Sequence, residues 1–293
     1  MLIELPISKS IANRLLILQA IHGDELMPVS DSMPDDVRIM SEAIRRLGER
    51  REARIDLGNC GTAMRFLTAY CAQLEDQTVI LDGIERMHHR PIGQLVDALR
   101  EIGADIEYLS KEGFPPLKIK GCILDKHRIV TINNPQSTQF VSAMLLIGAN
   151  AQTNSTSPYI TLTRELIQRY TTLHNSTQRY TIEKDWSSAA FWYEYVALHG
   201  GEITLPGLSR ESLQGDKVVA DIFAHLGVHT IYTDEGITIK KDNEFLIQQH
   251  KQLNPTTLSG NQLHAAHGAK ANNPLSREMV PPGRQGIKKG KGV

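Results

Sequence analysis

The chain has 293 residues, a length that accommodates two domains of ordinary size. Its 32 lysine and arginine residues nearly balance 33 aspartate and glutamate residues, so overall charge provides no attraction to nucleic acid or to anionic membranes. A hydrophobic content of 41% favours a globular protein over a disordered one, and the absence of a long apolar run disfavours a membrane-spanning helix. The three cysteines form no CxxC pair, and residues 1–6 lack the features of a signal peptide, so we expect a reducing, cytoplasmic location.

Three segments repeat one pattern, in which an amphipathic helix is followed by glycine and then by an alternating strand. In the first of them, apolar residues such as Met40 and Leu47 recur at helical spacing. A glycine after the last turn supplies a left-handed residue at low cost. The pattern indicates an α/β protein built by internal duplication, and chance similarity of common pieces is the alternative. The helices are expected over 35–47, 92–102 and 217–226, closed by Gly48, Gly103 and Gly227, with strands at 104–109, 117–120, 228–232 and 237–240.

The last part of the chain departs from this pattern. From about residue 248 no helical or strand period lasts, and residues 281–293 are rich in glycine, proline and basic residues. This composition predicts an irregular or disordered tail over residues 249–293. Contact of the basic tail with RNA or an anionic surface is the alternative, and it is disfavoured because no aromatic residue lies among the charges of residues 281–293 to stack on bases.

Residues 5–14 place a hydroxyl, an ammonium and a guanidinium at the start of a helix. Ser8 or Ser10 can serve as the N-cap, and Ser10 and Arg14 then lie one turn apart on the same face, with Lys9 beside the capped turn. Free backbone amides and the positive end of the helix dipole favour a bound phosphate or carboxylate there. A capped helix with solvated charges explains the same residues, and spacing alone does not decide between the two.

Residues 57–65 form a glycine-rich turn from a strand into a helix, in which Gly58 and Gly61 allow a ligand to approach the backbone. The turn matches neither a Walker A loop nor a dinucleotide-binding GxGxxG motif. Cys60 within it is either a nucleophile or a small buried residue. The second interpretation is favoured because no histidine lies near it in the sequence.

Residues 83–92 place two arginines and two histidines before a helix with Pro91 near its first turn, which indicates a cationic helix start. Metal binding by His88 and His89 is disfavoured, because neighbouring side chains diverge and no further ligand follows at the spacing of a metal site. Hydroxyl-rich helix starts follow at 134–146 and 183–191. Together the five starts predict a pocket for a small ligand with several acidic groups. A set of good helix caps is the alternative, and it explains the arginines less well.

Taken together and in this order, the segments resemble the 5-enolpyruvylshikimate-3-phosphate synthase family (3-phosphoshikimate 1-carboxyvinyltransferases) over residues from about 3 to 245. The sister family of UDP-N-acetylglucosamine enolpyruvyl transferases is similar, but it carries Lys-Asn at the first site and a catalytic cysteine ahead of an Arg-Pro helix. Here Lys9-Ser10 and Met87 to Arg90 stand at those places, which favours the shikimate family. The matching motifs are Ser8-Lys9-Ser10 with Asn13-Arg14, the blocks 57–65 and 85–104, Gln139 with its preceding hydroxyls, and residues 207–210 and 214–216.

The resemblance implies an α/β fold of two domains, an inside-out α/β barrel of repeated βαβαββ units whose helix N-termini point into the cleft between the domains. For this chain it implies a complete-looking substrate-binding domain at 9–180 and a partial second domain made of 1–8 plus 181–248, followed by the tail at 249–293. The segment 149–182 is expected to be abbreviated, because it lacks the joint of helix, glycine and strand.

The resemblance also implies a reaction, the transfer of the enolpyruvyl group from phosphoenolpyruvate to the 5-hydroxyl of shikimate 3-phosphate. This step belongs to the shikimate pathway, which leads to chorismate and the aromatic amino acids. The transferase is expected to be a monomer that needs no metal or organic cofactor, and to bind neither nucleic acid nor membrane. The resemblance implies Lys9, Ser10 and Arg14 as ligands of shikimate 3-phosphate, with Lys9 also facing phosphoenolpyruvate, and Gly61 and Arg90 as ligands of phosphoenolpyruvate. It implies Ser137, Thr138 and Gln139 as contacts of the phosphate and the ring. The further implied ligands are Asn59, Thr156 and Tyr159, of which the last two belong to a Ser-x-Pro-Tyr motif whose serine is replaced by Thr156.

The chain departs from the family in its last part. The family's catalytic aspartate, its Lys-Glu-x-Asp-Arg helix start and its further phosphoenolpyruvate ligands have no counterpart after Gln248. No catalytic residue is therefore identifiable, and turnover by this chain alone is expected to be absent or very weak. Exposed apolar surface on the partial domain is expected to favour association. The alternative is a non-catalytic fragment that binds a phosphorylated metabolite without transferring the enolpyruvyl group.

Overall fold

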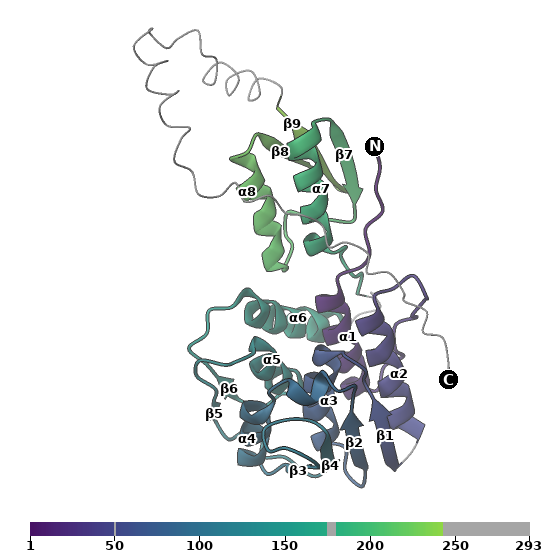
Figure 1. Ribbon diagram of the computed structural model, residues 1–293, viewed down its shortest axis with the longest axis vertical. Coiled ribbons are helices and arrows are strands. Elements are labelled where there is room, and N and C mark those ends of the chain that lie inside the picture. Colours follow the sequence, from purple (N-terminus) through teal and green to yellow (C-terminus); the bar gives the residue numbers. More distant parts are fainter. Residues whose placement is uncertain (50, 175–179, 243–293) are drawn as a thin grey trace, which may run out of the picture. The chain divides into compact units, whose positions relative to one another are not determined.

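The computed structural model describes residues 1–49, 51–174 and 180–242, and residues 52–120 fold into a four-stranded sheet with two helices (Figure 1). The elements in chain order are β1 (Glu52–Asp56), α3 (Gly61–Ala72), β2 (Thr78–Asp82), α4 (Gly93–Glu101), β3 (Asp105–Tyr108) and β4 (Leu117–Lys120). The strand order is β1-β2-β4-β3, in which β1 and β2 are parallel and β4 is antiparallel to both of its neighbours. This arrangement is a complete βαβαββ unit.

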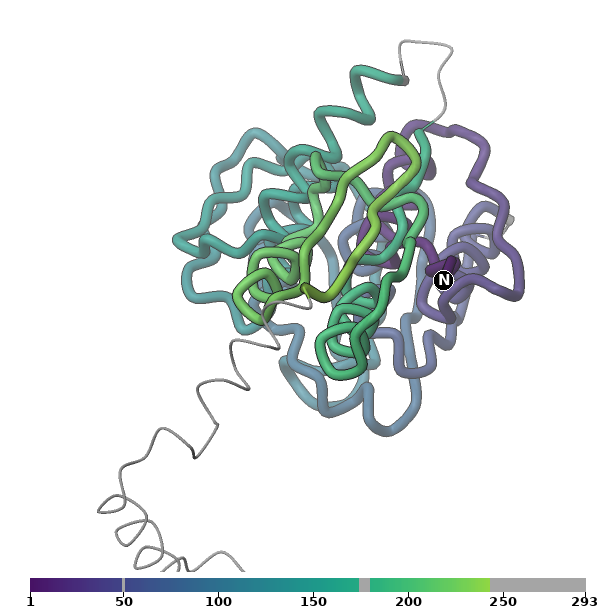
Figure 2. The backbone as a smooth tube through the Cα atoms, turned by 90° about the horizontal axis from the view of Figure 1, so that it is seen from above, coloured from purple at the N-terminus to yellow at the C-terminus, as the bar shows by residue number. Residues whose placement is uncertain are grey.

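A second sheet repeats this topology. Its elements are α7 (Trp186–His199), β7 (Glu202–Pro206), α8 (Val219–Ala224), β8 (Val228–Tyr232) and β9 (Gly236–Lys241). The strand order is β7-β9-β8, with β8 and β9 joined as the hairpin that ends the coloured tube in Figure 2. Leu2 pairs in parallel with Thr204 of β7, and the Thr204 amide donates to the Met1 carbonyl at 2.8 Å. Residues 1–3 therefore take the place of the first strand, and the predicted α/β class with repeated βαβαββ units is confirmed.

A third, smaller sheet pairs β5 (Val130–Thr131) with β6 (Ala151–Gln152) in parallel. Helix α5 (Thr138–Leu146) lies between the two strands in the chain, and α6 (Pro158–His174) follows them. In the described part of the chain no strand follows α6 before the bridge residue Lys184. The described residues of this segment contain no joint of glycine and strand after α6, and the residues directly after this helix, 175–179, lie outside the description.

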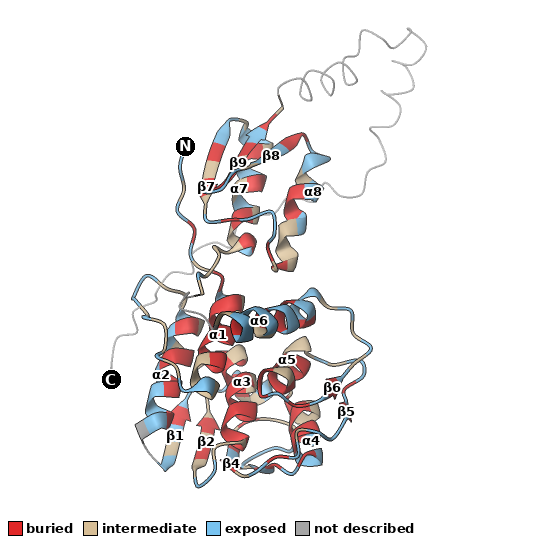
Figure 3. Ribbon diagram, turned by 180° about the vertical axis from the view of Figure 1, so that it is seen from behind, coloured by how far each residue is buried: buried red, intermediate tan, exposed pale blue. Residues whose placement is uncertain are grey.

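Helix α1 (Lys9–His22) is the centre of the larger hydrophobic core. Every residue from Ile11 to Leu18 is buried, because α2 (Asp35–Glu49), α3, α5 and α6 all pack against it. A helix that is covered on all sides carries apolar residues around its whole circumference. A smaller core lies between the second sheet and its helices, around Trp186, Tyr193 and Ile239 (Figure 3).

Two predicted helix boundaries are wrong. Gly48 does not close the first amphipathic helix, because it lies inside α2, which runs on to Glu49. The surrounding good helix formers outweigh the cost of one glycine. The helix predicted over 217–226 begins with the 3₁₀ turn η2 (Gly215–Val218), which leaves only α8 in α-helical form. Gly103 (φ 102°) and Gly227 (φ 76°) do adopt the left-handed conformation predicted for them.

The described residues from Met1 to Asp242 belong to one compact unit. None of their helices is both long and apolar enough to cross a membrane. The tail predicted over residues 249–293 lies outside the described residues.

Candidate functional site

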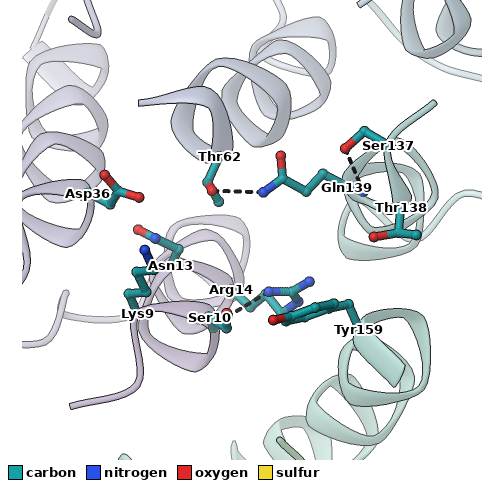
Figure 4. Close-up of a pocket in the computed structure, with 10 residues that line it drawn as sticks. All are labelled: Lys9, Ser10, Asn13, Arg14, Asp36, Thr62, Ser137, Thr138, Gln139 and Tyr159. Carbon is teal, nitrogen blue, oxygen red and sulfur yellow. Dashed lines mark hydrogen bonds between the residues drawn. The ribbon is translucent and has the colours of Figure 1, made fainter. Parts of the chain in front are cut away.

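Two adjoining pockets lie where helix starts of the larger core meet, and Figure 4 shows the first of them. The first pocket has a volume of about 360 Å³, which suits a small organic ligand. Asp36, Thr62 and Gln139 line both pockets, so the two are direct neighbours. The first pocket is lined by Lys9, Ser10, Asn13, Arg14, Asp36, Thr62, Ser137, Thr138, Gln139 and Tyr159, and the second by Asp36, Asn59, Gly61, Thr62, Arg65, Arg90 and Gln139.

The substrate ligands predicted from the sequence gather in these pockets with one exception. The predicted residues of α1, the group 137–139 and Tyr159 line the first pocket, whereas Asn59, Gly61 and Arg90 line the second. Thr156 is exposed and lines neither pocket. Thr156 lies in the loop between β6 and α6. The next residue, Ser157, accepts a hydrogen bond with its hydroxyl from the Tyr159 amide at 3.3 Å.

Arg14 is the most deeply buried cation of the first pocket, with 3% of its surface exposed. Its Nε–H donates to the Thr163 hydroxyl at 2.7 Å and its Nη1–H to the Ser10 carbonyl at 2.8 Å. The ring of Phe66 lies 5.2 Å below the guanidinium carbon. Burial lowers the pKa of Arg14 to about 10, so the side chain keeps its charge at neutral pH. A buried cation that no carboxylate neutralises is well placed to bind an anion.

Gln139 joins the two pockets. It lies in the first turn of α5, and its amide nitrogen donates to the Thr62 hydroxyl at 2.9 Å. Its carbonyl oxygen accepts from the Nη1 of Arg65 at 2.8 Å. Because both ends of the amide are bonded, Gln139 holds one fixed orientation between the two pockets.

The second pocket brings two guanidinium groups close to the start of α3. Arg90 follows the 3₁₀ turn η1 (Met87–His89), and its Nη1 donates to the Asn59 carbonyl at 3.2 Å. A side chain at Gly61 would overlap the Arg90 guanidinium and lie 2.8 Å from the Nη1 of Arg65. Burial, followed by the charge of Arg90, lowers the pKa of Arg65. An anion between the two guanidinium groups would relieve their repulsion.

The helix starts differ in how far their own side chains cap them. Ser8 precedes α1 but makes no capping hydrogen bond with its hydroxyl, which leaves the amides of the first turn available. Ser137 caps α5 by accepting from the Gln139 amide at 3.3 Å. The anion-binding start predicted at 183–191 is wrong, because Asp185 caps α7 and accepts from the Ser188 amide at 3.0 Å. A carboxylate already fills the position that an anion would take.

The charge of the site is strongly positive. Among the residues that the structure describes, Lys9, Arg14, Arg65 and Arg90 line the pockets together with a single carboxylate, Asp36. The ammonium of Lys9 makes no hydrogen bond or ion pair with any residue that the structure describes. Cations without matching carboxylates favour a ligand with several negative groups.

Cys60 is a structural residue rather than a nucleophile. It is 2% exposed, and burial, reinforced by the nearby Asp36 carboxylate, raises its pKa to about 12. Its sulfur accepts from the Ala63 amide at 3.4 Å and so caps α3. The neutral thiol at physiological pH lacks the thiolate character that attack requires. This agrees with the favoured interpretation of its sequence position.

The described residues contain no group of three histidine, cysteine, aspartate or glutamate side chains that could hold a metal ion. His88 and His89 contact carboxylates instead. The Nε2 of His88 lies 2.8 Å from Asp82, and the Nε2 of His89 lies 3.1 Å from Glu85. These contacts anchor η1, the turn that precedes Arg90.

Asp82 is expected to stabilise this turn in a pH-dependent way. Burial opposes its ionisation, but hydrogen bonds from His88, the Gly83 amide and Arg54 outweigh burial and lower its pKa below the ordinary 3.8. A carboxylate whose folded pKa is lowered stabilises the fold above its unfolded pKa, and this contribution is lost as pH falls through the folded value. Asp82→Asn should therefore lower the free energy of unfolding by about 1 kcal/mol at pH 7, and the deficit should shrink below about pH 4.

Urea unfolding of wild type and variant at pH 7 and at acid pH measures this difference. Asp105→Asn is the matched control, because Asp105 is an exposed aspartate on β3 of the same sheet. A deficit that stays constant down to pH 3 would contradict the role given to the Asp82 carboxylate.

Four pocket residues were not among the predicted ligands. Asn13, Asp36, Thr62 and Arg65 line the site, and the Asn13 Oδ1 and the Arg65 Nε are buried without a hydrogen-bond partner. Asn13 and Arg65 carried a signal, because each lies one helical turn after a predicted ligand, Lys9 and Gly61 respectively. Asp36 carried none, since acidic residues in a first helical turn are common for reasons of dipole alone.

Comparison with known families places these motifs in context. A family model described as EPSP synthase (3-phosphoshikimate 1-carboxyvinyltransferase) matches residues 49–262. A 3-phosphoshikimate 1-carboxyvinyltransferase of Bacteroides fragilis is 42% identical over 264 residues, which cover 82% of this chain and 63% of the relative. One of Colwellia psychrerythraea is 34% identical and covers 81% of this chain and 66% of the relative. The chain thus spans about two thirds of the length of these curated relatives.

Solved structures give the same fold. EPSP synthase from Acinetobacter baumannii superposes with a TM-score of 0.60 at 19% identity, covering 82% of this chain and 65% of that one. The enolpyruvyl transferase NikO from Streptomyces tendae superposes with a TM-score of 0.52 at 13% identity, covering 83% and 66%. At these identities the likeness concerns the fold.

Proposed function

This chain belongs to the EPSP synthase (3-phosphoshikimate 1-carboxyvinyltransferase) family, and from that premise we propose that its two pockets bind shikimate 3-phosphate and phosphoenolpyruvate. The observation that carries the proposal is the excess of cations among the described lining residues, four against one carboxylate. The two substrates together bear two phosphate groups and two carboxylates, so they supply the negative charge that the pockets lack.

Each pocket suits one of the two substrates. The first combines the buried Arg14 with the hydroxyls of Ser10, Ser137 and Thr138, a set that fits the carboxylate, hydroxyls and phosphate of shikimate 3-phosphate. The second brings Arg65 and Arg90 to the start of α3 and has room for the smaller phosphoenolpyruvate. Gln139 lines both pockets, Lys9 and Tyr159 line the first, and Asn59 lines the second. Thr156 is left out of this assignment because it is exposed and lines neither pocket.

The reaction proposed for the site is enolpyruvyl transfer in the shikimate pathway. A proton adds to the methylene carbon of phosphoenolpyruvate, the 5-hydroxyl oxygen of shikimate 3-phosphate bonds to the neighbouring carbon, and its proton passes to a base. The tetrahedral intermediate then loses a proton from the methyl group and expels phosphate, which restores the double bond. Lys9, Arg14, Arg65 and Arg90 hold the negative groups in place during these steps.

We further propose that this chain alone performs the transfer weakly or not at all. A general acid and a general base are needed, and among the lining residues that the structure describes only Asp36 carries a carboxylate. Binding of the phosphorylated substrate without turnover is the second candidate function, and the same charge distribution supports it.

The proposal for partners concerns the exposed face of α7, the helix that packs on the second sheet. Phe191, Tyr195 and Leu198 lie on one face of α7 and are 73%, 46% and 72% exposed. An apolar stripe of this kind favours association, although a monomer is expected for a complete enzyme of the family.

We also propose a cytoplasmic location, in keeping with a biosynthetic transferase.

Titration calorimetry of the purified chain tests the function. Shikimate 3-phosphate should bind, unphosphorylated shikimate should bind much more weakly, and phosphoenolpyruvate should bind in the presence of the first ligand. Phosphate release in the same mixture separates transfer from binding, and sedimentation of the same sample gives the oligomeric state. No binding of either substrate would overturn the proposed function, and rapid phosphate release would overturn the proposed weakness of turnover.

A further inference from the structure

Two buried hydroxyls hold the guanidinium of Arg14 from the side away from solvent. The Nε–H donates to Thr163 Oγ1 at 2.7 Å, and the Nη2–H donates to Ser142 Oγ at 3.3 Å. Thr163 lies on α6 and Ser142 on α5, and both side chains are completely buried. In the part of the chain that the structure describes, no carboxylate bonds to Arg14. This is unusual, because buried arginines are generally paired with an acid.

The two hydroxyls are arranged so that they only accept from Arg14. Thr163 Oγ1 lies 2.7 Å from the Tyr159 carbonyl, which can take its single hydrogen. Thr163 Oγ1 also lies 2.9 Å from Ser142 Oγ, which accepts the hydrogen of Thr163 when that hydroxyl turns toward it. Each oxygen then turns a lone pair toward the guanidinium. The hydroxyl hydrogens of Thr163 and Ser142 therefore point away from Arg14, and hydrogen-bond acceptors set the position of the guanidinium.

These acceptors fix the direction of the charge without cancelling it. A guanidinium has five N–H groups, and the bonds to Thr163, Ser142 and the Ser10 carbonyl use three of them. The remaining donors and the full positive charge are left for a ligand in the first pocket. A carboxylate at either hydroxyl position would neutralise the cation and compete with an anionic ligand.

We propose that Ser142 and Thr163 are positioning residues that orient the charged Arg14 toward the anionic substrate. The inference rests on the proposed function for the identity of that substrate, shikimate 3-phosphate. The two residues touch no pocket surface themselves and act only through Arg14.

The first test is independent of any ligand. In ¹H–¹⁵N spectra of the full chain, the Arg14 Nε–H should give a slowly exchanging signal, identified by its disappearance in Arg14→Lys. Thr163→Val should shift this signal and speed its exchange at least tenfold, and Thr163→Ser should restore it. Thr172→Val is the matched control, because Thr172 lies on α6, makes the same bond to a carbonyl four residues back, and is exposed. An unchanged signal in Thr163→Val overturns the proposal.

The second test measures coupling by calorimetry. Thr163→Val and Ser142→Ala should each weaken binding of shikimate 3-phosphate about tenfold, as expected for one hydrogen bond to a charged group. In an Arg14→Met background, Thr163→Val should cause no further loss. The same loss in both backgrounds would mean a merely structural role and would overturn the proposal. If the wild-type chain does not bind shikimate 3-phosphate, the proposed function fails, and the exchange of the Arg14 Nε–H still decides the positioning role.

Discussion

Replacing Arg14 by methionine should reduce the affinity for shikimate 3-phosphate by at least about 100-fold, because two charge-assisted hydrogen bonds are lost at once. The same change should leave the fold as stable as the wild type or more stable. Burial lowers the pKa of Arg14 to about 10, which means that the folded state disfavours the charged form that is present at neutral pH. Removing that charge removes a cost to folding, and the methionine side chain fills a similar volume among Phe66 and its neighbours.

The opposite signs of the two effects make the prediction specific. If Arg14 only supported the fold, Arg14→Met would lower both the stability of the protein and its affinity for shikimate 3-phosphate. Calorimetry gives the affinity, and urea unfolding at pH 7 gives the free energy of unfolding. Arg100→Met is a suitable control, because Arg100 also packs over an aromatic ring, that of Tyr108, but lies outside both pockets. A loss of more than about 1 kcal/mol of stability in Arg14→Met would contradict the binding role.

Much of the fold and most of the site could be predicted because their signals are local. The strand that ends before Gly58 and the helix that begins at Gly61 are visible in ten residues of sequence, and the structure contains both. Helix ends marked by Gly103 and Gly227 were equally clear, since the left-handed φ is a property of the residue itself. Gly48 shows the limit of that rule, because a glycine with good helix formers around it continues the helix.

The rest depends on contacts between distant parts of the chain. The pairing of Leu2 with Thr204 joins residues about two hundred positions apart, and residues 1–3 alone carry too few residues for a strand pattern. The same holds for the site. Ser142 and Thr163 lie on the buried faces of α5 and α6, where a hydroxyl predicts nothing until the packing of α1, α5 and α6 brings both to Arg14.

Gly61 offers the second large expected effect. Gly61→Ala should weaken the binding of phosphoenolpyruvate by about 10- to 100-fold, a loss on the scale of one or two bonds to charged groups. The backbone itself tolerates alanine, because Gly61 opens α3 without a left-handed φ. The added methyl group would instead overlap the Arg90 guanidinium and press on that of Arg65. Both groups end flexible side chains, so they move aside and the fold survives.

The affinity loss should be confined to the second pocket. Binding of shikimate 3-phosphate alone should change by less than about threefold, because Arg14 and Ser10 are untouched. Gly48→Ala is the matched control: nothing lies within 4 Å of the added carbon inside α2, so the variant should gain about 0.5–1 kcal/mol of stability and bind as the wild type does. Calorimetry with phosphoenolpyruvate in the presence of shikimate 3-phosphate measures the effect. If Gly61→Ala binds phosphoenolpyruvate within twofold of the wild type, the two arginines do not receive that ligand, and the assignment of the second pocket is wrong.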